Sequence, residues 1–206
     1  MKDVSRCIHA IGLAELSPPI FYQCPVALRF EIGDPTLDPY NKGCLSSDYA
    51  AKAFLRAKAL FEALPGRFDR LVWDTYPQEG QTAHQLQAFR RRVGAPTPQE
   101  MAFQDLQGEE PAQKVTYCWD LTYQPVRWEA LLGEIIAADL GGFAPLASSV
   151  YFLNTQENIL YHLYDDRGLD IAAEKRETLL PLYHRFSDWL LSYDQGRMEE
   201  TFGARR

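Results

Sequence analysis

The sequence predicts an α/β fold of the α+β type, with helices packed against a mixed sheet of about five or six strands. Segments with the two-residue periodicity of strands alternate with helical segments along the chain. Three strand-like runs lie between residues 150 and 173, and their turns are too short for a crossover, so they must form an antiparallel meander. Hydrophobic residues make up 46% of the 206 residues, which predicts a single domain over 1–206 with one core.

The first part of the chain predicts two strands and the clearest helix. Residues 21–33 alternate apolar and polar side chains, as a strand does. Residues 46–66 carry apolar side chains at helical spacing, and Ser46 or Ser47 can cap the start of this helix. Residues 68–77 predict the next strand.

Residues 93–112 have the weakest periodicity, and we expect an insertion or a mobile helical segment over residues 78–112. Within this segment, residues 97–100 read Thr-Pro-Gln-Glu, which has the pattern of a capping box with proline at the first helical position. A helix is therefore expected to start at this point. Residues 90–92 are three arginines, which we expect to lie on a solvated helix face in an acidic chain.

The second part of the chain predicts a strand, a helix, the meander and a final helix. Residues 115–123 have the composition of a strand, and Pro125 opens a helix over residues 126–140. After the meander, residues 179–194 carry an apolar stripe at helical spacing, which predicts one C-terminal helix whose stripe packs in the core. The stripe consists of Leu182, Phe186, Trp189, Leu190 and Tyr193.

The charge of the chain excludes some classes of partner. The formal net charge is −7, which argues against a general nucleic-acid binder and against a binder of anionic membranes. The first 16 residues do not have the pattern of a secretory signal, and no apolar run approaches the ~20 residues that span a bilayer. We therefore expect a cytoplasmic protein.

The cysteines and sequence motifs predict neither a metal site nor a cofactor. Cys7, Cys24, Cys44 and Cys118 are scattered, which fits free thiols better than a disulfide framework or a zinc site. The sequence contains no glycine-rich phosphate loop and none of the common hydrolase motifs.

An acidic turn closes the second hairpin of the meander. Asp165, Asp166 and Asp170 could hold a divalent cation, but they lack the spacing of a calcium loop and Arg167 lies among them. A structural turn with Gly168 in the left-handed conformation is the ordinary interpretation. A recognition surface is the remaining one, and its predicted partner-binding residues are Asp165, Asp166, Arg167, Asp170 and Glu174.

His162 is the candidate for acid–base chemistry, because it lies on a predicted strand close to the acidic turn. An enzyme of unknown reaction, with a site made of His162, the Asp165–Asp170 turn and Cys118, is therefore one alternative. A half-buried histidine satisfied by a neighbour is the more ordinary interpretation. Because no catalytic motif accompanies His162, we do not expect an enzyme.

Three segments carry a resemblance to a known family. They are FYQCPVALRFEIG at residues 21–33, YDDRG at 164–168 and DWLLSYD at 188–194. With these segments the chain resembles the bacterial family called domain of unknown function 3885. It departs from that pattern at Gln195, where a basic residue is expected, and residues 78–112 have no match. The resemblance implies no assigned catalytic residue.

Small acidic proteins of this style resemble immunity proteins encoded beside bacterial toxins, which is an analogy and gives a hypothesis. The leading hypothesis is a non-catalytic protein that neutralises a cognate toxin by direct binding. Carboxylates opposite a basic active-site cleft would speed association, and aromatic side chains would anchor the complex. A general regulatory or interaction protein, self-associating through a sheet edge, is a further alternative.

Overall fold

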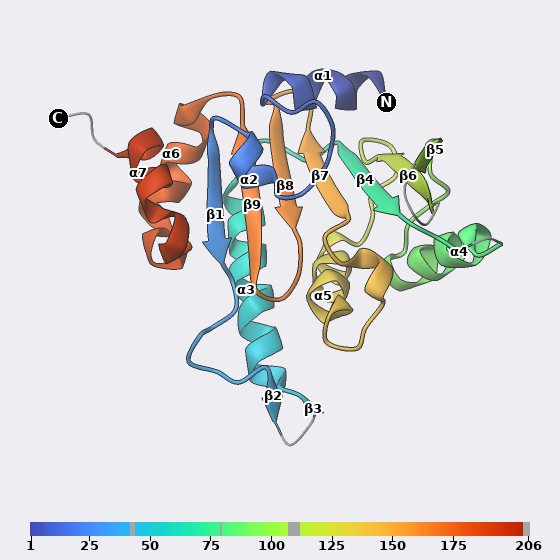
Figure 1. The fold of residues 1–206 in the computed structure, drawn as a ribbon, viewed down its shortest axis with the longest axis horizontal. Coiled ribbons are helices and arrows are strands. Elements are labelled where there is room, and N and C mark those ends of the chain that lie inside the picture. The colour runs from blue at the N-terminus through green and yellow to red at the C-terminus, as the bar shows by residue number, and fades with distance from the viewer. Residues whose placement is uncertain (42–43, 79, 107–111, 204–206) are drawn as a thin grey trace.

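One antiparallel sheet runs through the computed structural model, which describes residues 1–41, 44–78, 80–106 and 112–203. The order of its seven strands is β1-β9-β8-β7-β4-β6-β5 (Figure 1). The strands are β1 Ala27–Glu31, β4 Arg70–Thr75, β5 Glu100–Leu106, β6 Ala112–Asp120, β7 Val150–Asn154, β8 Ile159–Leu163 and β9 Gly168–Ala173. A separate hairpin pairs β2 Tyr40–Asn41 with β3 Cys44–Leu45.

The α+β class and the C-terminal meander β7-β8-β9 are confirmed. The sheet has more strands than expected, and every described pairing is antiparallel rather than mixed. The reason lies in the connections. Each helical connection between described strands joins two strands that are not neighbours in the sheet, so none of them creates a parallel pair.

Helices cover both faces of the sheet (Figure 1). The long helices α3 and α5 lie behind the sheet in this view, and α1 and α2 lie on the opposite side. No helix in the described parts of the chain is long and apolar enough to cross a membrane. The helices are α1 Lys2–Ala10, α2 Ile20–Gln23, α3 Ser47–Ala63, α4 Thr82–Val93, α5 Trp128–Ala138, α6 Arg176–Arg185 and α7 Gln195–Phe202, with short 3-10 turns η1 Ala144–Leu146, η2 Ser187–Trp189 and η3 Ser192–Asp194.

Aromatic side chains fill the layer between the sheet and helices α3, α4 and α5. Phe61 stacks on Trp128 with ring centroids 4.5 Å apart and meets Phe152 edge-on at 5.1 Å. Trp73 stacks on Phe89 at 4.5 Å. Each such aromatic pair stabilises the fold by about 1 kcal/mol beyond the burial of its area, so these pairs help to hold the helices on this face of the sheet.

The helix predicted over 46–66 is confirmed as α3, and the Ser46 side chain caps it by accepting from Tyr49 N at 3.4 Å. The strand predicted over 21–33 is shorter, because residues 20–23 form the single turn α2 before β1 begins. The helix start predicted at residues 97–100 is wrong. Gln99 N donates to Cys118 O at 3.0 Å, which begins the pairing of β5 with β6 in place of a helix.

The described part of residues 78–112 forms α4 and β5, while residues 79 and 107–111 lie outside the description. Phe89 and Val93 bury α4 against the core, and the whole of β5 pairs with β6. The basic residues 90–92 occupy the last turn of α4. The segment is thus tied to the rest of the sheet at both elements.

The prediction of a single C-terminal helix over residues 179–194 is wrong. Helix α6 ends at Arg185, and two 3-10 turns precede α7. Leu190 forms an isolated bridge with Phe30, and Leu191 N donates to Arg29 O at 3.0 Å. These bonds to β1 require extended backbone where a helix would continue. Tyr193, which the helical stripe placed in the core, is 86% exposed.

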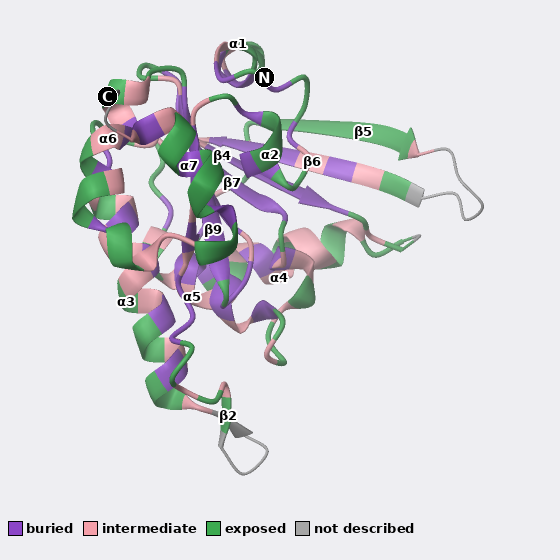
Figure 2. Ribbon diagram, turned by 60° about the vertical axis from the view of Figure 1, so that its left-hand side comes forward, coloured by how far each residue is buried: buried purple, intermediate pink, exposed green. Residues whose placement is uncertain are grey.

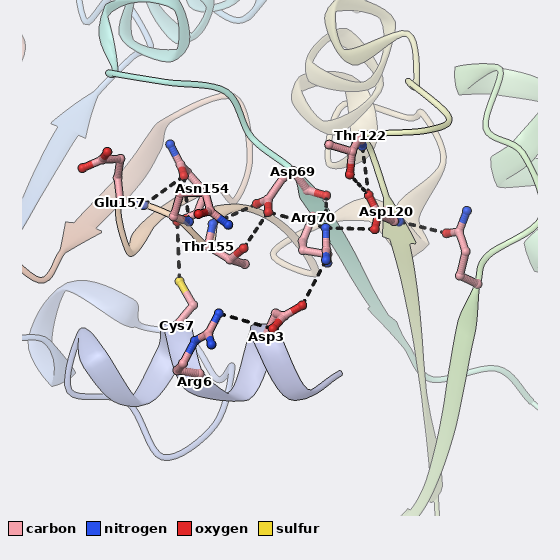
Figure 3. Close-up of polar contacts among 12 residues, drawn as sticks. Asp3, Arg6, Cys7, Asp69, Arg70, Asp120, Thr122, Asn154, Thr155 and Glu157 are labelled. Carbon is pink, nitrogen blue, oxygen red and sulfur yellow. Dashed lines mark hydrogen bonds and ion pairs between the residues drawn. The ribbon is translucent and has the colours of Figure 1, made fainter.

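Polar contacts hold α1 across one end of the sheet (Figure 3). Arg70 is at their centre, where it pairs with Asp3 at 3.1 Å and with Asp120 at 3.2 Å. Next to it, Asp69 accepts from Thr155 N at 2.8 Å. Asp3 therefore ties α1 to β4, and the Cys7 thiol adds a contact of 3.8 Å to Asn154 O of β7. The segment then leads into the loop that overlies the sheet face opposite α3.

Candidate functional site

The acidic turn of the meander makes its bonds within the chain. Asp165 Oδ1 accepts from Arg167 N at 2.8 Å, and its Oδ2 accepts from Arg167 Nε at 2.8 Å. Asp166 Oδ2 accepts from the Tyr49 hydroxyl of α3 at 2.7 Å. Asp165 and Asp166 are only 2% and 5% exposed. The turn therefore uses its carboxylates to hold its own backbone and to attach α3.

Gly168 does not adopt the left-handed conformation that the turn chemistry predicted. The glycine is required for another reason. A Cβ at this position would lie 2.8 Å from Phe30 O and would also collide with the Tyr164 hydroxyl. Close approach of β1 to the start of β9 therefore excludes a side chain at residue 168.

Asp170 is not at the surface but belongs to a buried ion cluster around Arg29, which we call the Arg29 cluster. It is fully buried, and its two oxygens pair with Arg29 Nε at 2.7 Å and Nη2 at 2.9 Å. Phe21 N donates to Asp170 Oδ2 at 3.0 Å. Arg29 Nη1 also reaches Asp194 at 3.4 Å, and Asp194 accepts from the Tyr22 hydroxyl at 2.8 Å. The cluster joins α2, β1, β9 and η3.

Two of the five predicted partner-binding residues present their charges to solvent. The Arg167 side chain is 73% exposed, and the exposed Glu174 accepts from Asn158 Nδ2 at 2.8 Å. The expectation of an acidic edge does not hold for the three aspartates, because all three are buried. Asp165 pairs with Arg167 of the turn, Asp166 accepts from Tyr49, and Asp170 pairs with Arg29. Binding of a partner at Arg167 and Glu174 stays a prediction.

His162 is fully buried at the centre of β8, rather than half-buried. Its ring stacks on Tyr151 of β7 at 4.6 Å, and Asp170 of β9 lies opposite it in the ladder. Burial lowers the pKa of His162 to about 4, so the imidazole is neutral at pH 7. Neither ring nitrogen has a hydrogen-bond partner among the described residues, which differs from the expected satisfied histidine.

Cys118 does not join His162. It lies on β6, which β7 and β4 separate from β8, and burial raises the pKa of its thiol to about 11. Cys7 and Cys24 are likewise buried and free, while the Cys44 side chain lies outside the description. In the described residues, no three His, Cys, Asp or Glu side chains are grouped to hold a metal ion.

Strand β5 is an open edge of the sheet, which the sequence did not reveal. Among the described strands it pairs only with β6, and both strands extend beyond the helices (Figure 2). Met101 and Phe103 are 51% and 53% exposed. The strand carries Glu100 and Asp105 and contains no Lys, Arg or Pro. The alternation of Met101 and Phe103 could have indicated a strand, but the helix-start pattern just before it pointed the other way.

Comparison with known proteins identifies the family. The model of DUF3885, described as a domain of unknown function, matches residues 8–194. The chain belongs to the DUF3885 family. The uncharacterized protein YnaE of Bacillus subtilis strain 168 is 34% identical over 53 residues, which is 26% of this chain and 25% of YnaE. The match thus spans about a quarter of that curated relative. No solved structure matches the chain.

The DUF3885 region contains all the features described above. It begins within α1 and ends at Asp194, so the Arg29 cluster, the acidic turn, His162 and the β5 edge all lie inside it. The family resemblance inferred from the sequence is therefore confirmed. The family description gives no activity, so a function has to be argued from the geometry.

Proposed function

We propose that this DUF3885 protein acts by binding another protein, and that its partner is a bacterial toxin that it neutralises as an immunity protein. The open edge of β5 is the observation that carries the proposal. A seven-residue edge strand presents a row of backbone N–H and C=O groups that can pair with a further strand. Soluble proteins usually protect such an edge with lysine, proline or a covering segment, and β5 itself contains no lysine or proline.

An extended segment of the partner would add to the sheet beside β5. Main-chain hydrogen bonds supply affinity in this mode of binding, and alternate side chains supply specificity. Met101 and Phe103 are exposed on alternate positions of the strand, where they can pack against apolar side chains of the added strand. Large apolar side chains of this kind are the usual anchors of an interface.

Charge favours a basic partner over a second copy of this chain. Glu100, which pairs with the N-terminal ammonium group of Met1, and Asp105 flank the apolar centre of β5, and the whole chain has a net charge of −7. A basic toxin segment would be attracted to this edge and would associate faster. Two copies joined through β5 would instead bring four carboxylates into one ribbon, which opposes self-association.

The test begins with the proteins encoded next to this chain in its source genome. Each is co-produced with the wild-type chain, and with Met101→Lys/Phe103→Lys, in cells that report toxicity. The matched control is Leu55→Lys, which changes an apolar residue of helix α3 that is 61% exposed and does not belong to strand β5. We expect the double variant to weaken the complex about 100-fold and to lose protection, and the control to keep both.

Thermal unfolding of both variants tests whether their folds are intact. Binding of the wild type is expected to weaken with added salt, because the attraction between a basic segment and an acidic edge is screened. Full protection by the Met101→Lys/Phe103→Lys variant contradicts the role of β5. Failure of every neighbouring gene product to be toxic and to bind contradicts the immunity function. If the wild-type chain forms a homodimer that the same substitutions abolish, the β5 edge serves self-association, and the immunity function is contradicted.

A further inference from the structure

A cleft opens on the sheet face that the N-terminal loop overlies. Its smaller part has a volume of about 290 Å³ and is lined by His162, Arg29, Asp170, Tyr164, Pro18 and Ser148, among others. A larger part of about 560 Å³ continues toward Lys114 and Asp74. The two parts share Pro18 and Ser148 in their walls, so they adjoin.

His162 is the feature of this cleft that points to a ligand. The side chain is fully buried, it lines the smaller part, and both ring nitrogens lack a partner among the described residues. The Ser148 backbone lies near the ring, but without the geometry of a hydrogen bond. A neutral imidazole has one N–H donor and one bare nitrogen acceptor, and leaving them unpaired in the interior costs free energy. A bound molecule that reaches one of these nitrogens removes part of that cost.

Ser148 is a second, independent indication. Its φ is +54°, in the left-handed region that a residue other than glycine seldom adopts. Its N–H donates to Tyr164 O at 2.8 Å, which holds this conformation beside both parts of the cleft. Strained backbone of this kind gathers at ligand-binding sites, where the surrounding structure maintains it.

The charges beside His162 are already neutralised. Both oxygens of Asp170 accept from Arg29, and Phe21 N takes a further acceptor position. Asp194 contacts the remaining side of the guanidinium. Burial raises the pKa of Tyr164, so its hydroxyl stays protonated and available as a donor. A charged ligand would lose its hydration without finding a free counter-charge, whereas an uncharged one would not.

We infer that the cleft binds a small uncharged molecule through a carboxamide-type group, which hydrogen-bonds to His162. A carboxamide carries both a donor and an acceptor without a net charge, so it can hydrogen-bond to the ring nitrogen that faces the cleft in either neutral tautomer. The body of the molecule would extend toward Tyr151 and the larger part of the cleft. This inference does not rest on the proposed function, because it is argued from His162 and the smaller part of the cleft, which no β5 residue lines, although Gln104 and Leu106 of β5 line the larger part.

Three probes of nearly the same shape test the inference: nicotinamide, which is uncharged, nicotinate, an anion, and 1-methylnicotinamide, a cation. Each is titrated into the full chain while the histidine ring ¹⁵N signals are followed by NMR. We expect nicotinamide to shift the His162 signals saturably, and the two charged probes to bind at least about tenfold more weakly. His162→Phe, which keeps the stacking surface beside Tyr151, should abolish the nicotinamide response of the neighbouring residues.

The matched control is His84→Phe, which changes an exposed histidine of α4 and should leave binding unchanged. Circular dichroism and thermal unfolding test whether both variants are folded. The inference is overturned if nicotinamide leaves the His162 signals unchanged at the limit of its solubility, because solvent then satisfies the ring. It is also overturned if all three probes bind equally, or if the His162→Phe variant retains the response.

Discussion

The Arg29 guanidinium and the Asp170 carboxylate form a two-point ion pair across the neighbouring strands β1 and β9, with N–O distances of 2.7 and 2.9 Å. The two residues are 141 positions apart in the chain. Asp194, near the C-terminus, reaches the same guanidinium. The pair thus fixes three distant segments at one buried point, and its removal should affect the whole fold.

We predict that Asp170→Asn destabilises the protein strongly. The substitution leaves the buried Arg29 charge with only the longer contact to Asp194, and breaking a buried pair costs about 3–5 kcal/mol in the free energy of unfolding. Urea denaturation followed by tryptophan fluorescence measures the effect. Asp188→Asn, at an exposed position, is the control and should change the free energy by less than about 0.5 kcal/mol.

A paired replacement should cost less than the single one. Arg29→Met combined with Asp170→Leu removes both charges of the pair, and Asp194 keeps its hydrogen bond from the Tyr22 hydroxyl. We expect this double variant to be more stable than Asp170→Asn in the same denaturation experiment. A double variant that is as unstable as the sum of the two single variants would show that the residues do not act as a pair.

The two glycines Gly168 and Gly133 should respond in opposite directions to alanine. At Gly168 a Cβ would lie 2.8 Å from Phe30 O, which is backbone and cannot move aside, so we expect a loss of about 2 kcal/mol. At Gly133, inside α5, no other atom lies within 4 Å of the added Cβ. Alanine there should stabilise by about 0.5–1 kcal/mol, because glycine is the poorer helix former. Equal effects on thermal unfolding would contradict the close approach of β1 to β9.

Local signals explain which elements the sequence could predict. Helix α3 has its cap at Ser46 and its apolar face within one segment, and the strands of the meander are joined by short turns. The errors occurred where a distant strand decides the backbone. Pairing with β6 converts residues 100–106 into β5, and the bridge from Phe30 to Leu190 interrupts the C-terminal helix. Neither contact can be predicted from the pattern of residues close in sequence.

The same limit applies to the candidate site. The sequence located Asp165, Asp166 and Asp170 correctly at the turn and the strand that follows, but their exposure depends on Tyr49 and Arg29, which approach from other elements. His162 was placed on a strand near these carboxylates, as found. Its complete burial follows from the N-terminal loop overlying that face. Exposure of the β5 edge likewise depends on the strand order, which the sequence did not determine.

The buried imidazole of His162 should make stability depend on pH. Its pKa is lowered from 6.5 to about 4, chiefly by burial, while Asp170, Asp165 and Arg29 face it. Between these values the unfolded chain binds a proton that the folded chain does not, so stability falls as the pH is lowered from about 6.5 toward 4. The expected loss between pH 7 and pH 5 is about 2 kcal/mol.

Comparison with the His162→Phe variant isolates this contribution. The variant keeps the facing Asp165 and Asp170 and the Arg29 guanidinium, so the two proteins differ only at residue 162. We therefore expect the wild type to lose more stability than the variant as the pH falls from 7 to 5 in urea denaturation. Parallel curves for the two proteins would show that His162 accepts its proton as readily folded as unfolded, and that the ring is not desolvated.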